Sequence, residues 1–399
     1  MAGHRPHVTG AVLLLTTLAL AAPATAADPP PTCHGQAATI TGPDQPGGNT
    51  VTGTSGDDVI VLPGPQFWRV FAGAGNDTIC TGDGGDIVFG EDGNDLIDTG
   101  AGADLLFGGP GDDQLYGGLD GSAQGDNLSG GPGDDTMDAG FDPGADHAVS
   151  FDSISFGDSP QGVQVDLVAG TATGDGSDTI APEPGLQIDG STFGDTLVGS
   201  DAAEEFYGGT GADMVQAAGG DDLIDVGADN EADTVDAGNG NDTIFGDGHD
   251  SVTGGAGDDN LGSYGFGIGG PGNAKPSWSL DGGTGVDSVT LGVGDDLVAT
   301  LDEQAGTMVW GPHHNPVTSI ERYRWTSGQL IYRGTSAAET VHLRRSLDEL
   351  PAITAYLRGG DDRVVGSSGK DYVDGGPGID FVKGRKGKDT CVHVEEGPC

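Results

Sequence analysis

Basic residues and large apolar residues are both scarce in this chain. Its 399 residues include 15 Lys and Arg against 63 Asp and Glu, a formal net charge of −48, and twelve of the basic residues lie between Arg322 and Lys388. Hydrophobic residues make up 35% of the chain and aromatic residues 6%. So acidic a chain repels nucleic acid and anionic membranes. So small an apolar supply excludes a conventional large core, which leaves partial disorder or a fold held together by something other than apolar burial.

Long hydrophobic runs are absent beyond the N-terminus. A positive start at His4 and Arg5 precedes the apolar residues 11–22 and an A-x-A cleavage motif at 24–26. This pattern is typical of a secretory signal peptide and is too short for a membrane-spanning helix. We therefore expect residues 1–26 to be removed and the remaining chain to be soluble and secreted, without a membrane span.

Cysteine is also rare, with four residues at Cys33, Cys80, Cys391 and Cys399. An even number in an exported chain indicates two disulfides, for which three connectivities are possible. The positions at the two ends of the chain favour Cys33–Cys80 and Cys391–Cys399. A zinc site is disfavoured, because no C-x₂-C pair or histidine cluster accompanies the cysteines.

Glycine, in contrast, is abundant, with 77 residues, and much of it follows a nine-residue period. From Ala72 the chain reads AGAGNDTIC, TGDGGDIVF, GEDGNDLID, TGAGADLLF and GGPGDDQLY, with aspartate at the sixth position of every unit. The first array covers residues 72–140 and the second 191–262; a short array follows at 281–299, and the last lies in 357–399. Self-similarity at a fixed period indicates a solenoid.

The repeated unit resembles the RTX, or haemolysin-type, calcium-binding repeat, G-G-x-G-x-D-x-U-x, where U is a large apolar residue. Six units carry the whole pattern, beginning at Gly108, Gly130, Gly208, Gly254, Gly282 and Gly375. The resemblance implies an all-β fold, a right-handed parallel β-roll of the serralysin-like kind, in which two nonapeptides complete one turn and Ca²⁺ lies between loops on successive turns. By that resemblance Asp95 would share one ion with Asp77 and another with Asp113. Asp86 would pair in the same way with Asp104.

The residue types also suit calcium. Glycine permits a positive φ that turns carbonyl oxygens inward, aspartate adds a carboxylate, and Ca²⁺ takes about six to eight oxygen ligands. The last three residues of each unit are expected to form a short strand whose central side chain, such as Ile79 or Val215, points inward. The predicted calcium ligands are the sixth-position aspartates Asp77, Asp86, Asp95, Asp104, Asp113, Asp126, Asp135, Asp213, Asp222, Asp233, Asp242, Asp259, Asp287, Asp296, Asp362, Asp371, Asp380 and Asp389.

A turn-forming role without metal is the alternative for these aspartates, since Asp and Gly favour turns. Stacked coils would however bring rows of carboxylates to within about 4.8 Å of each other. No basic residue occurs in 70–274 to neutralise them. This spacing favours a cation between the coils.

The segments between the arrays break the period. Residues 141–190 alternate apolar and polar residues and are expected to form spacer strands. Residues 263–356 contain, besides the short array, the strand candidates TMVW, ERYRW, QLIYR and TVHL. Neither segment reaches the usual size of an enzyme domain, so we expect extra strands on the same solenoid. Residues 27–71 and the C-terminal end are expected to cap it.

Catalytic motifs are absent. The chain contains no G-x-S-x-G motif, and no H-E-x-x-H, so the protease domain that accompanies some arrays of this kind is missing. His313 and His314 could bind a metal, but an exposed turn before Pro316 is favoured. A sugar-stacking platform could be formed by Trp310, Tyr323, Trp325 and Tyr332, but packing between strands is favoured.

The sequence therefore predicts a secreted, non-enzymatic calcium-binding protein that folds when Ca²⁺ binds. Its N-terminal signal departs from the uncleaved C-terminal export signal of many similar proteins, which puts their export route in doubt here, but not the calcium sites. The alternative is an extracellular adhesin or matrix protein whose calcium-stabilised repeats bind a cell-surface polysaccharide or protein.

Overall fold

The computed structural model describes residues 30–43, 47–119, 125–140, 152–247, 249–268, 278–293, 298–310, 313–326, 329–343, 353–385 and 387–399. Within these ranges all regular structure is β-strand. The expected signal peptide, 1–26, and Asp296 lie outside the described residues. No helix long and apolar enough to cross a membrane occurs in the described part of the chain.

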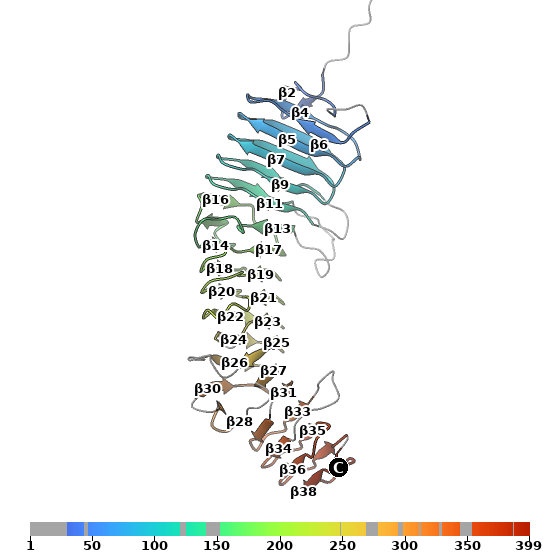
Figure 1. Ribbon diagram of the computed structural model, residues 1–399, viewed down its shortest axis with the longest axis vertical. Coiled ribbons are helices and arrows are strands. Elements are labelled where there is room, and N and C mark those ends of the chain that lie inside the picture. Colours follow the sequence, from blue (N-terminus) through green and yellow to red (C-terminus); the bar gives the residue numbers. More distant parts are fainter. Residues whose placement is uncertain are drawn as a thin grey trace, which may run out of the picture.

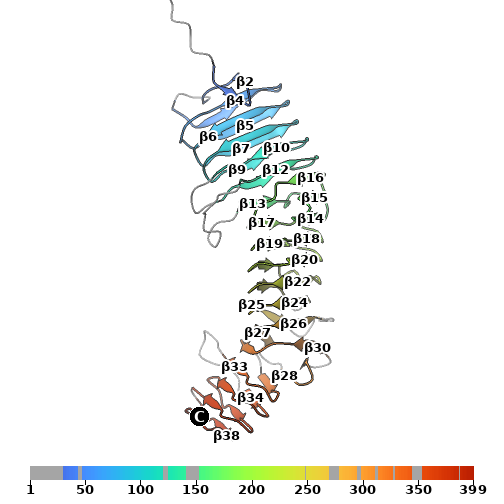
Figure 2. The ribbon, with the colours of Figure 1, turned by 180° about the vertical axis from the view of Figure 1, so that it is seen from behind.

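The chain winds into one elongated parallel β-solenoid, with the first coils at one end and the last at the other (Figures 1 and 2). The predicted all-β parallel β-solenoid is thereby confirmed. One side of the coils is a 16-stranded parallel sheet, called here the continuous sheet. Its strands are β3 (Thr50–Thr52), β5 (Arg69–Ala74), β7 (Ile87–Asp92), β9 (Leu105–Phe107), β11 (Asn127–Ser129), β13 (Asp152–Ser155), β17 (Leu186–Asp189), β19 (Glu205–Tyr207), β21 (Leu223–Asp225), β23 (Thr243–Phe245), β25 (Asn260–Ile268), β27 (Ser288–Val293), β31 (Arg322–Trp325), β33 (Thr340–Leu343), β35 (Arg363–Val365) and β37 (Phe381–Lys383).

The opposite side, called here the interrupted sheet, consists of three parallel runs. The first run is β4 (Val59–Val61), β6 (Thr78–Gly82), β8 (Leu96–Gly100), β10 (Gln114–Tyr116), β12 (Thr136–Asp138) and β16 (Ser177–Ile180). The second is β14 (Gln164–Asp166), β18 (Thr196–Val198), β20 (Met214–Gln216), β22 (Thr234–Asn239), β24 (Ser251–Ala256), β26 (Ser279–Thr284) and β30 (His313–Thr318). The third is β28 (Val298–Asp302), β32 (Gln329–Arg333), β34 (Ile353–Tyr356), β36 (Tyr372–Asp374) and β38 (Thr390–Val392).

Two antiparallel inserts of the same design join these runs. In the first, β15 (Thr171–Thr173) lies between β14 and β16 and pairs antiparallel with both. In the second, β29 (Thr307–Trp310) lies in the same way between β28 and β30. Three strands thus take the place of one, and the stack of coils changes course at each insert (Figure 1). The extra strands were predicted, but their antiparallel pairing was not.

The core is a stack of the single inward side chain from each nonapeptide strand. Ile79 is aligned with Ile97 in the neighbouring coil, and Val88 with Leu106, so 18 residues complete one turn. All four side chains are fully buried, as is Val215. Burial stabilises each by about 1.5–3 kcal/mol. The predicted inward position is confirmed.

The aromatic residues of the second insert region pack inside the solenoid. Tyr323, Trp325 and Tyr332 are buried, which agrees with the packing interpretation. The exposed turn expected at His313 and His314 is wrong, because both residues belong to β30 and pair with β29. The reason is the insert itself, which extends these residues along a neighbouring strand.

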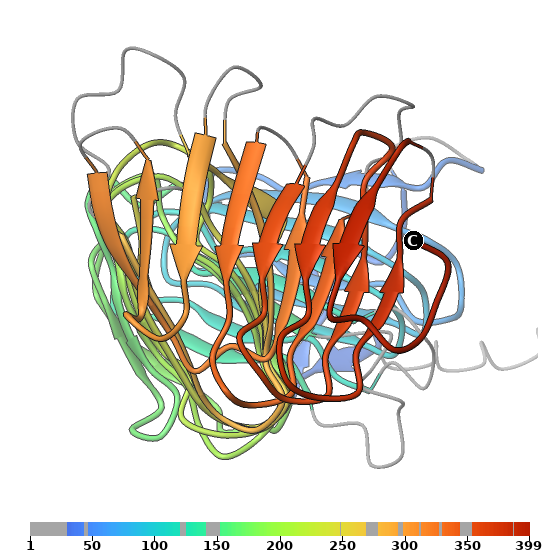
Figure 3. The ribbon, with the colours of Figure 1, turned by 90° about the horizontal axis from the view of Figure 1, so that it is seen from below.

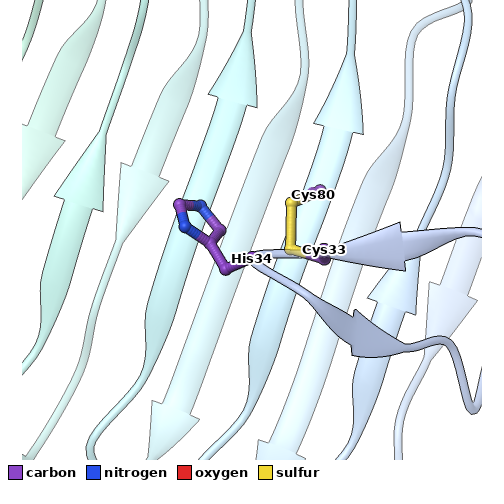
Figure 4. Close-up of side chains that lie close together, drawn as sticks. All are labelled: Cys33, His34 and Cys80. Carbon is purple, nitrogen blue, oxygen red and sulfur yellow. A yellow bond between two sulfur atoms is a disulfide. The ribbon is translucent and has the colours of Figure 1, made fainter.

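Both predicted disulfides are present. Cys391 is bonded to Cys399, with a Cα–Cα distance of 6.0 Å. At the other end, the short hairpin of β1 (Thr32–Cys33) and β2 (Gln36–Ala37) is fixed to β6 by the Cys33–Cys80 bond (Figure 4). His34 lies beside this disulfide, and its Nε2 is 2.9 Å from Oδ2 of Asp98. Each disulfide ties a chain end to the solenoid.

Candidate metal centre

The glycines of the repeat allow the turns of successive coils to approach closely. Gly111 has a φ of +145°, and a Cβ placed on it would lie 1.8 Å from the carbonyl oxygen of Gly93 in the preceding coil. Any other residue would collide with that oxygen, and L residues rarely adopt this φ. The sequence pattern therefore brings carbonyl oxygens against the next turn.

The sixth-position carboxylates form two rows along the solenoid, called here the inner ladders, one before the strands of each sheet. In one ladder, the backbone N–H of Asp77 donates to Oδ1 of Asp95 at 2.8 Å, and that of Asp95 donates to Oδ1 of Asp113 at 2.7 Å. In the other, the N–H of Asp86 donates to Oδ1 of Asp104 at 2.5 Å. The three pairs expected to share an ion are thus neighbours on successive coils.

The second oxygen of these carboxylates has no protein donor. Among the described residues, Oδ2 is buried without a hydrogen-bond partner in Asp77, Asp86, Asp95, Asp104, Asp113, Asp135, Asp213, Asp222, Asp242, Asp259, Asp287, Asp362 and Asp380. Buried polar atoms are almost always satisfied, so this repeated exception requires an explanation.

The unsatisfied oxygens face further oxygen atoms. A Cβ placed on Gly90 would lie 2.3 Å from Oδ2 of Asp95 and 2.6 Å from the carbonyl oxygen of Gly108, one coil further on. A Cβ placed on Gly108 would likewise lie 2.3 Å from Oδ2 of Asp113 and 2.6 Å from the carbonyl oxygen of Gly130. Carboxylate and carbonyl oxygens therefore converge between successive glycine loops. Hard oxygen donors of both kinds are what Ca²⁺ prefers, so these residues fit a calcium ion.

The electrostatics of the ladders are also compatible with a cation. Burial, aided by the charges of Asp135 and Asp95, raises the pKa of Asp113 to about 8. Burial likewise raises the pKa of Asp222 to about 8 and that of Asp95 to about 6. In each case the desolvated carboxylate resists ionisation. A divalent cation held between two such groups would favour their charged form.

The structure brings the predicted ligands together with few exceptions. Of those described, all but Asp389 are at most 3% exposed. Asp389 is partly exposed, yet its Oδ1 accepts from the N–H of Asp371 at 3.0 Å. Both oxygens of Asp371 are already satisfied, because the N–H and hydroxyl of Ser367 donate to them at 2.8 and 2.6 Å. Asp371 therefore lacks the free oxygen that the glycine loops provide.

Ser367 represents a second kind of loop, in which a serine or threonine precedes the ladder acid by four residues. Ser191 donates its N–H and hydroxyl to Asp195 at 2.6 and 2.7 Å, and Ser200 donates in the same way to Glu204. Neither acid has an unsatisfied buried oxygen. The serine loops therefore satisfy both oxygens of the ladder acid with the chain's own donors. The threonine loop differs, because Thr335 donates its N–H and hydroxyl to Oε1 of Glu339 and leaves Oε2 buried without a hydrogen-bond partner among the described residues.

Several ladder acids were missed by the sequence analysis. They include Asp58, Asp178, Asp195, Glu204, Asp250 and Glu339, all buried. Asp250 lies within the second array but is not among the predicted ligands. The remainder lie outside intact nonapeptides, and the pattern G-[S/T]-x-x-x-[D/E] would have found Asp58, Asp195, Glu204 and Glu339. Glutamate extends the ladder because its longer side chain reaches the same backbone N–H, as Glu321 does for Asp287 at 2.8 Å.

Comparison with known proteins agrees with this geometry. The family model for the RTX calcium-binding nonapeptide repeat matches residues 45–61, 69–88, 89–121, 119–142, 198–230, 228–261 and 356–391. These ranges contain most of the glycine loops, while the short array at 281–299 lies outside them. No curated protein matches the chain.

Proposed function

Because the chain belongs to the RTX calcium-binding nonapeptide repeat proteins, we propose that it is an exported, non-enzymatic protein whose solenoid folds when Ca²⁺ binds between its glycine loops. The observation that carries the proposal is the row of buried Oδ2 atoms with no protein donor. At Asp95 and Asp113 this oxygen faces the carbonyl oxygens of Gly108 and Gly130 on the adjacent coil. Ca²⁺ would be held there by the ladder aspartates together with these carbonyl oxygens.

Folding and binding are coupled by this arrangement. The ligands of one ion come from residues about 18 positions apart, and only the coiled chain brings them together. The binding free energy of every ion therefore contributes to the stability of the fold. Without a cation, the buried carboxylates and the overall charge of −48 oppose the coiled state.

Export is supported by the N-terminal segment and by the composition. Residues 1–26 have the pattern of a signal peptide, and RTX repeats are typical of exported proteins. Two disulfides are compatible with an oxidising compartment. Millimolar extracellular calcium would also fill sites with dissociation constants of about 10⁻⁴–10⁻³ M. An uncleaved N-terminus on secreted protein would contradict this part of the proposal.

A role in binding surface polymers is the second candidate. The continuous sheet presents an extended surface of 16 parallel strands to such a partner. In that case calcium would support the surface that binds the partner.

Circular dichroism of the mature chain tests the central proposal. The protein in excess chelator should lack most of its β-signal, and adding Ca²⁺ should restore it with a steep midpoint. Mg²⁺ at the same concentration is the control, because it demands a tighter octahedral shell than these loops offer. A full β-spectrum in chelator would contradict the proposal.

A further inference from the structure

The last coils carry a row of cations on the outer face of the continuous sheet. Strands β31, β33, β35 and β37 lie side by side there (Figure 3, orange to red). Their outward side chains include five cationic or ionisable bases, to which the turn after β37 adds a sixth. We call Arg322, Arg324, His342, Arg363, Lys383 and Arg385 the basic strip; all six are exposed.

The parallel register sets the spacing of the strip. Arg324 is aligned with His342 on the next strand, and Arg322 stands two strands from Arg363 in the same row. Neighbouring strands are about 4.8 Å apart. The members of the strip are close enough to affect one another's charge. Burial, together with the charges of Arg363, Arg385 and Arg324, lowers the pKa of His342.

No acid neutralises the strip within the described residues. Its members make no ion pair there, and its only stacking contact is Arg363 over the ring of Phe381, at 4.4 Å from the ring centre. The arginines on the opposite sheet differ, since Arg333 and Arg358 both lie within 4.0 Å of Asp302. In so acidic a chain, a cluster of unpaired cations indicates a surface that meets an anion.

We propose that the basic strip binds an extended acidic polysaccharide through its carboxylates. Guanidinium groups bind carboxylates in a bidentate manner, and four of the six side chains are arginines. The strip spans roughly 14 Å by 7 Å between Cα positions. The area enclosed by these Cα positions is far smaller than the area of about 800 Å² per partner that a stable protein interface buries. A thin polymer with repeated charges fits this row better than a second folded chain does.

The choice of a polysaccharide rests on the proposed export, which places the protein among surface glycans. The acidic coils, with no basic residue in 70–274, would repel a polyanion. The polymer is therefore confined to the C-terminal coils. Contacts of this kind are screened, so the affinity falls as salt is raised.

The test measures binding of the calcium-loaded full-length mature protein to hyaluronan fragments, a glucuronate polymer, by fluorescence anisotropy at low ionic strength. The triple variant Arg324→Gln, Arg363→Gln and Lys383→Gln should weaken binding roughly tenfold or more. The matched control, Arg69→Gln, Lys370→Gln and Lys388→Gln, removes the same number of exposed charges elsewhere and should bind as wild type does.

Three results would overturn the proposal. They are equal weakening in both triple variants, no hyaluronan binding by wild type, or tighter binding of single-stranded DNA of equal charge. Concentration-dependent dimers lost only in the strip variant would overturn it in favour of a second copy. Circular dichroism with and without Ca²⁺ on the same samples keeps a failure of this surface distinct from a failure of calcium-coupled folding.

Discussion

Replacing Asp95 with asparagine should affect the fold in opposite directions with and without calcium. The introduced asparagine keeps an oxygen that can accept from the N–H of Asp77, now 2.8 Å from Oδ1. Its amide nitrogen replaces Oδ2, which has no protein donor, and can donate to the nearby carbonyl oxygen of Gly108. In chelator the variant is therefore relieved of a buried charge. Since burial raises the pKa of Asp95 from 3.8 to about 6, the gain at neutral pH is on the order of 2–3 kcal/mol.

In calcium the same substitution removes a charged ligand. Asp95 lies between Asp77 and Asp113 in its ladder, so both adjacent positions lose a carboxylate oxygen. We expect the affinity to fall about tenfold or more and the stoichiometry to fall by at least one ion.

Isothermal titration gives the affinity and stoichiometry, and urea unfolding gives the stability in Ca²⁺. The size of the β-signal in chelator shows whether the variant retains more structure than wild type there. Asp138→Asn is the control, because it removes the same charge from the outer surface of β12, outside the inner ladders. A turn-forming role would leave both variants close to wild type. Identical affinity and stoichiometry in all three proteins would refute the ligand assignment.

Two further outcomes follow from the same groups. Burial raises the pKa of Asp113 and of Asp222 from 3.8 to about 8, so the calcium-free fold is favoured in acid and loses stability as pH rises between these two values. Circular dichroism in chelator at pH 5 and pH 8 measures this, and a larger β-signal at pH 8 would contradict it. Ser367→Ala removes a hydrogen-bond donor from buried Asp371, so it should lower the free energy of unfolding by about 1–3 kcal/mol with little change in calcium stoichiometry. The control Ser336→Ala, at an exposed residue, should be neutral, and loss of an ion in Ser367→Ala would show that its loop binds calcium.

The nine-residue period explains why the core positions and the pairing of the ladder aspartates could be predicted from the sequence. A turn of fixed length followed by one inward side chain leaves a single way to stack, so residues such as Ile79 and Leu106 could be placed before the structure. The pairing of Asp77 with Asp95 follows from the same period, once two units make a turn. Cys33 and Cys80 were correctly paired by their position at one end of the chain.

The rest could not be read from local patterns. The strands of the first antiparallel insert pair locally, as β15 does with β14 and β16, but their place in the stack depends on the distant pairing of β12 with β16. The serine loops were missed because their pattern differs from that of the nonapeptide, and only the structure shows that Ser191 donates to Asp195 within a ladder. The basic strip was missed because only the register aligns Arg324 with His342.

The most direct test of the account is a crystal structure grown in Ca²⁺, with anomalous differences used to locate the ions. Peaks are predicted between glycine loops of successive coils, for example beside Oδ2 of Asp95 and the carbonyl oxygen of Gly108. No peak is expected at the serine loop of Asp371, whose oxygens already accept from Ser367. Ions found only on exposed carboxylates, with the inner ladders folded and free of them, would contradict the central claim.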